Sequence, residues 1–200
     1  MTSLKERKAA VRKQLIALRD AMSAEARESA SQCILEKVAH DAGYRNARTV
    51  LAYYGFGTEL NTKPFLESAL AEGKILALPR IDRTGRLLEL YRILNFNLDL
   101  TPGPWGILEP RVNGDRRVDV GEIDWVLVPG LGFDAQCNRL GYGAGFYDTL
   151  FADAQRKGGA MPKRISGAFD CQLVESVPAG EYDLPVDCVI TKSNQYNRKV

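Results

Sequence analysis

A short apolar run that leads into a glycine-rich turn and then a helical pattern constrains this chain's fold most strongly. The run, Trp-Val-Leu-Val at residues 125–128, ends at a Pro-Gly pair. Such a run is typical of a strand buried on both faces of a sheet. Glycines then alternate through residues 141–145, and from residue 144 apolar side chains recur at helical spacing. The stretch predicts a strand, a tight turn and a helix, whose backbone amides and helix dipole suit a phosphate.

The glycines alone leave two interpretations open. Their spacing differs from the dinucleotide fingerprint, whose third glycine comes one residue later, and from the Walker loop, which ends in Gly-Lys and Ser or Thr. A tight turn that requires positive φ angles explains them equally well. A phosphate site therefore needs support from other residues.

Composition limits the classes of function. Two hundred residues suit one domain, and 27 basic against 25 acidic residues argue against nucleic-acid binding by bulk charge. No apolar run approaches membrane-spanning length, so we expect no membrane association. The four cysteines lack Cys-x-x-Cys spacing and His40 is the single histidine. A zinc site is therefore not expected. We expect instead that the cysteines are reduced thiols in a cytoplasmic protein.

The amino-terminal segment predicts a basic, amphipathic helix. Ser3 and Glu6 have the spacing of a capping box, and an apolar stripe continues to about residue 21. Lys8 and Arg12 are four residues apart and share one face. From the helix alone, a solvated basic face is the simpler interpretation.

Strand-like and helix-like segments alternate along most of the remaining chain. A second helix is expected from the Ser23 cap to Gly43, and another begins at Thr62 and ends at Gly73. Residues 95–121 read as a long irregular section and residues 194–200 as a frayed end. The alternation predicts an α/β protein, residues 1–200 forming a single domain with a largely parallel sheet flanked by helices. The strands are expected at residues 49–54, 74–78, 87–94, 125–128, 164–169 and 188–191.

Several polar or aromatic residues stand where such a fold binds ligands. Glu59 follows a strand and two glycines, and Arg80 follows another strand. Trp105, in the long loop, has a ring able to stack on a flat ligand. Asp187 differs from these residues, because it precedes the last expected strand, where an aspartate is most often a turn residue. Each has a plainer interpretation as a turn, loop or anchoring residue.

Two long strings resemble the signature of the 5-formyltetrahydrofolate cyclo-ligase family, also called 5,10-methenyltetrahydrofolate synthetase. They are Pro-Gly-Leu-Gly-Phe-Asp at residues 129–134 and Asn-Arg-Leu-Gly-Tyr-Gly-Ala-Gly-Phe-Tyr-Asp at residues 138–148. The resemblance continues over nearly the whole chain. It implies a layered α/β fold related to the phosphosugar isomerase and CoA-transferase group. It also implies ATP-driven cyclisation of 5-formyltetrahydrofolate to 5,10-methenyltetrahydrofolate, through a phosphorylated formyl oxygen, with release of ADP and phosphate.

The same resemblance implies the roles of individual residues. Asp148 and Asp187 would hold Mg²⁺, and Arg80 and Trp105 are weaker site candidates. Two positions depart from the usual pattern: Ala144 stands where Gly or Lys is expected, and Phe146 where Tyr is commoner. The folate would contact Arg12, Tyr54, Glu59, Tyr142, Gly143, Ala144, Gly145 and Phe146. ATP would contact Lys8, Arg12, Arg139, Leu140, Gly141, Tyr142, Gly143, Ala144, Gly145, Phe146 and Tyr147.

The resemblance further implies a cytoplasmic monomer. Its partners would be small molecules, ATP and 5-formyltetrahydrofolate with or without a polyglutamate tail. Two rival functions remain open from the sequence. One is an enzyme of the same fold group that acts on a phosphosugar or a CoA thioester. The other is a non-catalytic protein that binds ATP or folates.

Overall fold

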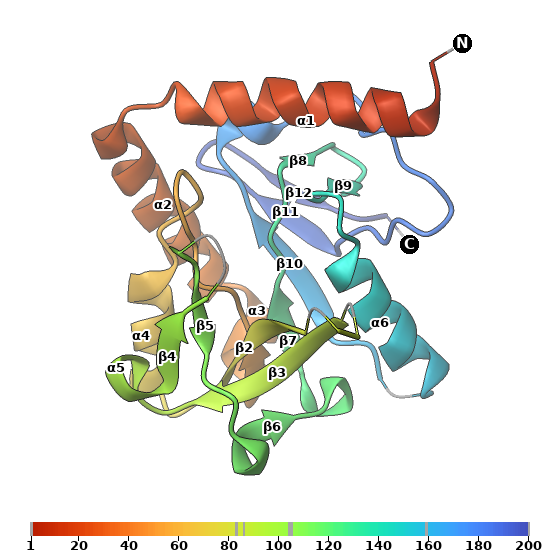
Figure 1. The fold of residues 1–200 in the computed structure, drawn as a ribbon. Coiled ribbons are helices and arrows are strands. Elements are labelled where there is room, and N and C mark those ends of the chain that lie inside the picture. The colour runs from red at the N-terminus through yellow and green to blue at the C-terminus, as the bar shows by residue number, and fades with distance from the viewer. Residues whose placement is uncertain (1, 83, 86, 104–105, 159, 200) are drawn as a thin grey trace.

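An eight-stranded sheet with strand order β12-β11-β10-β7-β1-β2-β3-β6 forms the centre of the protein (Figure 1). The computed structural model describes residues 2–82, 84–85, 87–103, 106–158 and 160–199. The pairings that join β2, β1, β7, β10 and β11 are parallel, whereas β3, β6 and β12 pair antiparallel. The predicted α/β class with a largely parallel sheet is confirmed. The strands are β1 (Thr49–Leu51), β2 (Ile75–Asp82), β3 (Leu87–Ile93), β6 (Arg117–Val118), β7 (Trp125–Leu127), β10 (Lys163–Gly167), β11 (Cys188–Ile190) and β12 (Gln195–Asn197).

Helices cover both faces of this sheet. α2 (Ala24–Ala39), α3 (Ala42–Asn46) and α4 (Lys63–Ala71) lie on one side, and α6 (Phe146–Arg156) lies on the other (Figure 1). Successive residues of a strand point to opposite faces, so each strand supplies both cores. In β7, Trp125 and Leu127 join the core under α2–α4, while Val126 joins the core under α6. This double burial explains why the inner strands read as continuous apolar runs.

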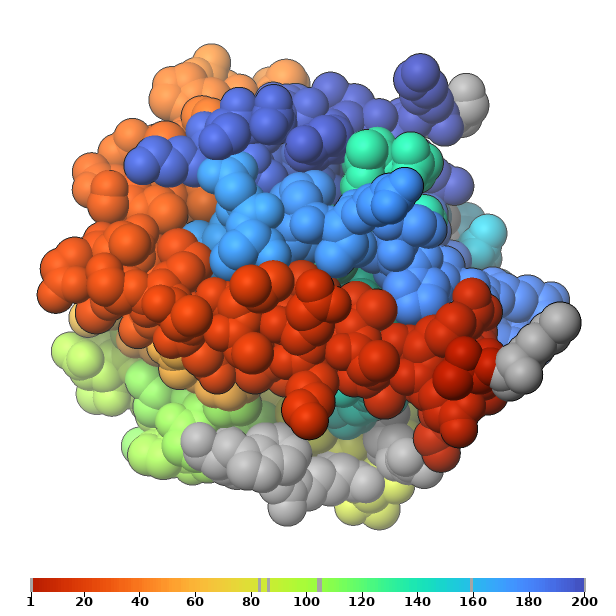
Figure 2. Space-filling model, turned by 90° about the horizontal axis from the view of Figure 1, so that it is seen from above, coloured from red at the N-terminus to blue at the C-terminus, as the bar shows by residue number. Residues whose placement is uncertain are grey.

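Helix α1 (Leu4–Asp20) crosses one end of the molecule (Figures 1 and 2). The predicted capping box is present, because Ser3 accepts a hydrogen bond from the Glu6 backbone and Glu6 accepts one in return. Leu15 packs inward with Leu140 and Val177. Beside α1 lie the short helix η4 (Asp170–Gln172) and the two-stranded sheet β8 (Gly132–Phe133) with β9 (Arg139–Leu140).

Short elements occupy much of the segment predicted to be irregular. They are α5 (Phe96–Asp99), β4 (Leu100–Pro102), β5 (Leu108–Pro110), η2 (Gly114–Arg116) and η3 (Val120–Glu122). Strands β4 and β5 pair antiparallel to form a separate small sheet. Among the residues described, no helix is long and apolar enough to cross a membrane.

Two boundary predictions are wrong, and so is the side-chain cap predicted at Thr62, although Thr62 is the N-cap residue of α4. The second helix ends at Ala39 and not at Gly43, because the Asp41 carboxylate accepts from the Tyr44 backbone and starts α3 instead. The Thr62 side chain does not cap α4, since its hydroxyl donates to the Tyr53 carbonyl. Residues Gln195–Asn197, predicted to be frayed, form the edge strand β12.

Candidate active site

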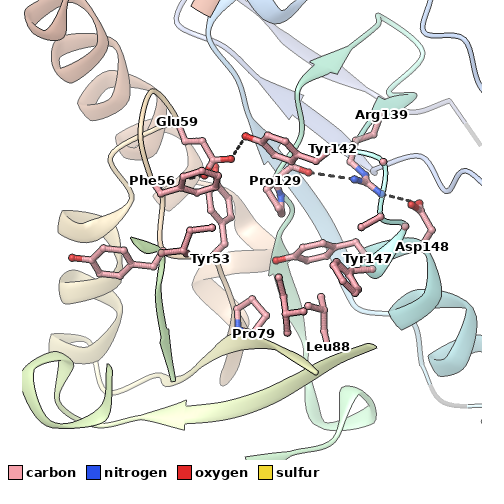
Figure 3. Close-up of a pocket in the computed structure, with 18 of the residues that line it drawn as sticks. Tyr53, Phe56, Glu59, Pro79, Leu88, Pro129, Arg139, Tyr142, Tyr147 and Asp148 are labelled. Carbon is pink, nitrogen blue, oxygen red and sulfur yellow. Dashed lines mark hydrogen bonds and ion pairs between the residues drawn. The ribbon is translucent and has the colours of Figure 1, made fainter. Parts of the chain in front are cut away.

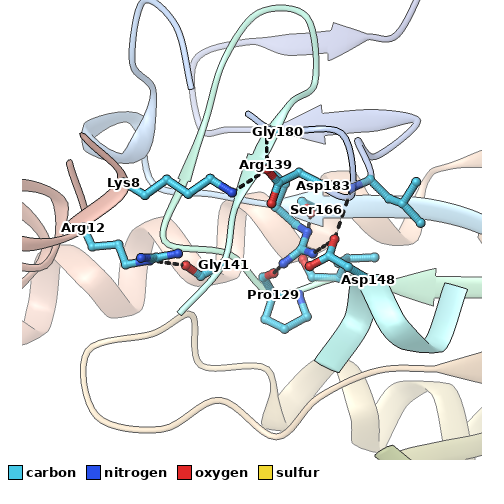
Figure 4. Close-up of polar contacts among 11 residues, drawn as sticks. Lys8, Arg12, Pro129, Arg139, Gly141, Asp148, Ser166, Gly180 and Asp183 are labelled. Atoms are coloured by element: carbon cyan, nitrogen blue, oxygen red, sulfur yellow. Dashed lines mark hydrogen bonds and ion pairs between the residues drawn. The ribbon is translucent and has the colours of Figure 1, made fainter. Parts of the chain in front are cut away.

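A pocket opens at the carboxyl ends of β1 and β7, the edge where open α/β sheets usually bind ligands. Tyr53 and Tyr54 follow β1, and Pro129 follows β7. The glycine-rich turn and the start of α6 form one wall (Figure 3), and α1 contributes Lys8 and Arg12 (Figure 4). The strand, turn and helix predicted from the sequence therefore form the framework of the pocket.

One half of the pocket is largely apolar. Its walls come from the loop after β1, from β2 and β3, and from the segment that enters β5. Alternation along β2 points Pro79 and Ile81 into the pocket and Arg80 away from it. A flat ring system fits such a lining. The apolar and aromatic residues are Tyr53, Tyr54, Phe56, Pro79, Ile81, Leu88, Ile107 and Leu108.

A carboxylate lies within this apolar half. Glu59 accepts a hydrogen bond from the Tyr142 hydroxyl (Figure 3) and one from the Phe56 backbone at 3.3 Å. Burial raises the pKa of Glu59, although these bonds and the positive charge of Arg19 oppose the effect. Burial also raises the pKa values of Tyr142 and Tyr147 well above the usual tyrosine value. Both phenols are therefore neutral at physiological pH.

The other half of the pocket is charged, with positive and negative groups in pairs. Lys8 on α1 forms an ion pair with Asp183, whose carboxylate also accepts from the Gly180 backbone at 2.5 Å (Figure 4). Arg139 donates from Nη2 to Asp148 Oδ1 at 2.7 Å. The Leu184 backbone donates to the same Asp148 oxygen at 3.1 Å. The residue next to Asp183 therefore contacts Asp148 directly.

The glycine-rich turn lies between the two halves. Gly143 has a φ of +113° and Gly145 a φ of +73°, conformations that favour glycine. Gly145 is also the N-cap residue of α6, so the positive end of that helix faces the pocket. Arg12 donates to the Gly141 carbonyl at 2.8 Å and its guanidinium lies beside Gly143. Arg12 therefore connects the turn to α1 and places a positive charge beside it.

Comparison with known proteins identifies the family. A model of the 5-formyltetrahydrofolate cyclo-ligase family matches residues 4–192. This chain belongs to that family. The 5-formyltetrahydrofolate cyclo-ligase of Mus musculus is 30% identical over 175 residues, which cover 85% of this chain and 86% of the relative. The enzyme of the same name from Escherichia coli (strain K12) is 32% identical over 151 residues, which cover 74% and 79%.

Solved structures agree with this assignment. The NMR structure of Aquifex aeolicus 5,10-methenyltetrahydrofolate synthetase superposes with a TM-score of 0.81 at 29% identity, over 96% of this chain and 93% of that one. A 5,10-methenyltetrahydrofolate synthetase from Mycoplasma pneumoniae shares the fold, with a TM-score of 0.71 at 22% identity over 92% and 98%. The predictions of family, fold and membership of a cyclo-ligase enzyme family are confirmed.

Most residues that the cyclo-ligase resemblance pointed to lie around this pocket. Three described candidates do not line it. Leu140 packs in the small core beneath α1, and Arg80 donates to the Pro110 carbonyl at 2.8 Å. Trp105 lies outside the described residues. The predicted residues that line the pocket are Lys8, Arg12, Tyr54, Glu59, Arg139, Gly141, Tyr142, Gly143, Ala144, Gly145, Phe146, Tyr147 and Asp148.

Asp187 is the third exception, because it does not line the pocket. It precedes β11, at the amino-terminal edge of the parallel strands, and its carboxylate pairs with Arg164 at 2.7 Å. The pocket lies at the opposite edge, where the strands end. Asp183 on the connector before β11 lines the pocket instead, and sequence reasoning missed it because nothing local distinguishes an aspartate in a connector.

The residues present fit a magnesium ion that is shared with a nucleotide. Among the side chains the structure describes, no group of three or more His, Cys, Asp or Glu could hold a metal by itself. Mg²⁺ commonly uses one or two carboxylates, with phosphate oxygens and water completing its shell. Asp148 and Asp183 provide two carboxylates in the charged half of the pocket.

Proposed function

We propose that this cyclo-ligase family member catalyses the ATP- and Mg²⁺-dependent conversion of 5-formyltetrahydrofolate to 5,10-methenyltetrahydrofolate, ADP and phosphate. One observation carries the proposal: a single pocket joins an apolar half containing Glu59 to a charged half containing two cations and two carboxylates. The apolar half suits a pterin ring. The charged half suits a metal-bound triphosphate.

The chemistry explains why ATP is needed. The formyl group is an amide, so resonance makes its carbon a poor electrophile and its oxygen a poor leaving group. Transfer of the γ-phosphoryl group to that oxygen removes both obstacles. The neighbouring folate nitrogen then attacks the carbon and loses its proton, which closes the ring, and departure of phosphate leaves the methenyl group. The protein has to align oxygen with phosphorus and to balance the developing charge.

The residues fit these tasks. Lys8, Arg12 and Arg139 would bind phosphate oxygens, together with backbone amides at the start of α6. Asp148 and Asp183 would hold Mg²⁺, which when bound neutralises phosphate charge. Glu59 would accept hydrogen bonds from N–H groups of the pterin.

Activity of the purified protein tests this function. We expect an ATP-dependent rise in the near-ultraviolet absorbance of the methenyl product when 5-formyltetrahydrofolate and Mg-ATP are supplied. Omitting ATP, or chelating the metal, should abolish the rise. Binding of both ligands without any ATP-dependent rise would favour a non-catalytic binder. Turnover of a phosphosugar or a CoA thioester would favour the other rival.

Location and assembly stay predictions. We propose a cytoplasmic monomer, as expected from the sequence. Sedimentation of the purified protein at several concentrations would test the monomer, because a self-associating chain shifts to larger species as concentration rises.

A further inference from the structure

A buried arginine in the last turn of α1 lies outside the roles assigned so far. Arg19 is only 6% exposed. Among the described residues it donates to two hydroxyl groups, from Nε to Thr58 Oγ1 and from Nη1 to the Tyr142 oxygen, each at 3.0 Å. Burying a cation without compensation is costly. The compensating negative charge comes from the two carboxylates that accept from these hydroxyls, Glu59 and Asp20.

The donor and acceptor properties fix the direction of each bond. A guanidinium only donates, so the Tyr142 oxygen accepts from Arg19 and its single proton goes to Glu59 Oε1. By the same logic, the Thr58 hydroxyl accepts from Arg19 and donates a hydrogen bond to Asp20 at 2.5 Å. The tyrosine hydroxyl therefore bridges a buried cation and a half-buried carboxylate, and the chain of bonds requires an accepting oxygen on Glu59.

We propose that Arg19 is a positioning residue for folate binding, which acts through the Tyr142 hydroxyl to keep Glu59 ionised and directed into the pocket. The proposal rests on the function inferred above. Arg19 also joins the loop that carries Thr58 and Glu59 to the glycine-rich turn that carries Tyr142. Each segment contributes a lining residue to the pocket, Glu59 from the loop and Tyr142 from the turn.

Electrostatics supports this role. The groups that act on Glu59 are the Tyr142 hydroxyl, the Phe56 backbone amide and the charge of Arg19, all of which lower its pKa against the effect of burial. The negative charge of Glu59 also contributes to the raised pKa values of the Tyr53 and Tyr147 phenols. Without Arg19, burial would be opposed less strongly and the carboxyl would keep its proton to a higher pH.

The first test compares Arg19→Met, Arg19→Lys and Tyr142→Phe with the control Arg7→Gln, which removes an exposed charge from the same helix. For Arg19→Met we expect KM for 5-formyltetrahydrofolate to rise about tenfold, with KM for ATP nearly unchanged. The acidic limb of kcat/KM should move upward by about one pH unit. Arg19→Lys should change the KM for 5-formyltetrahydrofolate and the pH profile less than Arg19→Met does, because lysine keeps the positive charge. The double variant Arg19→Met/Tyr142→Phe should resemble either single variant, because both substitutions break the same chain of hydrogen bonds from Arg19 through Tyr142 to Glu59.

A second test does not depend on turnover. The carboxyl ¹³C resonance of Glu59, assigned with Glu59→Gln, should titrate at higher pH in folded Arg19→Met than in wild type. An unchanged titration would overturn the proposal. Additive effects in the double variant, or a fall in melting temperature with unchanged pH profiles, would do the same. A wild-type protein without turnover but with the expected titration shift would instead count against the proposed function alone.

Discussion

At the scale of single residues, the charged half of the pocket is balanced before any ligand binds. Lys8 faces Asp183, and Arg139 faces Asp148 at 2.7 Å. Each pair consists of a cation suited to phosphate and a carboxylate suited to Mg²⁺. Binding of a metal nucleotide would therefore exchange partners among groups already in place. The two carboxylates are expected to be equally necessary.

Two matched variants test which aspartate serves the site. Asp183→Asn should reduce turnover by at least tenfold and weaken Mg²⁺ dependence, because it removes one of the two proposed metal ligands from the pocket. Asp187→Asn should retain turnover but lose stability, by roughly 1–3 kcal/mol, because it weakens the bonds to Arg164. Steady-state assays and thermal unfolding measure the two effects. The reverse pattern would reinstate Asp187 as the ligand.

The sequence pointed to residues that line the pocket where a local motif carried the signal. Arg139, Gly143 and Asp148 lie within one continuous string, so the sequence alone pointed to them. Asp183 and Arg19 contact the site only through the tertiary arrangement of α1 and the connectors, which no local pattern encodes. Asp187 illustrates a rule that sequence reasoning could have applied: a residue that precedes a parallel strand lies at the edge away from the ligand.

At the scale of elements, α1 brings several functional groups to the site at once. Lys8, Arg12, Leu15 and Arg19 recur at helical spacing and all face the body of the protein. Leu15 is the buried apolar residue of α1, and it packs against Gly132 of β8. A Cβ atom added at Gly132 would lie 2.3 Å from Leu15 Cδ1. The absence of that side chain sets how closely α1 approaches.

Gly132→Ala should therefore displace α1 and with it the phosphate-binding cations. We expect a stability loss of about 1–3 kcal/mol and a rise in KM for ATP. Gly114→Ala is the matched control, because a Cβ there meets nothing within 4 Å. Melting temperature and steady-state kinetics provide the readouts. Unchanged kinetics in Gly132→Ala would show that the seat of α1 does not govern ATP binding.

Elements were predictable where periodicity or a cap marked them, and less so at their ends. The capping box placed the start of α1 correctly. The break between α2 and α3 depends on the Asp41 carboxylate, which also binds Trp125 Nε1 at 3.0 Å and Lys163 at 2.8 Å. Those partners are distant in sequence. Strand β12 likewise exists because it pairs with β11, although its own residues are polar.

At the scale of the whole molecule, the parallel sheet collects its functional ends along one edge. The alternation of apolar runs and helical stretches predicted this class of fold. It did not predict the strand order, in which β7 lies between β1 and β10. That order places the residues after β1 beside those after β7, and so joins the apolar and charged halves of the pocket.

Coupling between the metal and the nucleotide should be visible in the stability of the whole chain. A triphosphate without Mg²⁺ would draw Lys8 and Arg139 away from Asp183 and Asp148 and leave both carboxylates uncompensated, so each ligand should bind better in the presence of the other. Mg-ATP at about a hundred times its Kd should stabilise the fold by roughly 2.7 kcal/mol. ATP with a chelator, or Mg²⁺ alone, should stabilise it far less. Equal shifts in melting temperature for ATP with and without metal would contradict the coupling.

The seat of α1 also bears on how the protein matures during synthesis. The helix is translated well before the surfaces that receive it, around Gly132, Leu140 and Val177. Until they emerge, its apolar stripe has no partner and its cations have no site to serve. A nascent chain that ends at β7 would therefore lack the surface that receives α1, and the helix could dock only after these later segments have emerged.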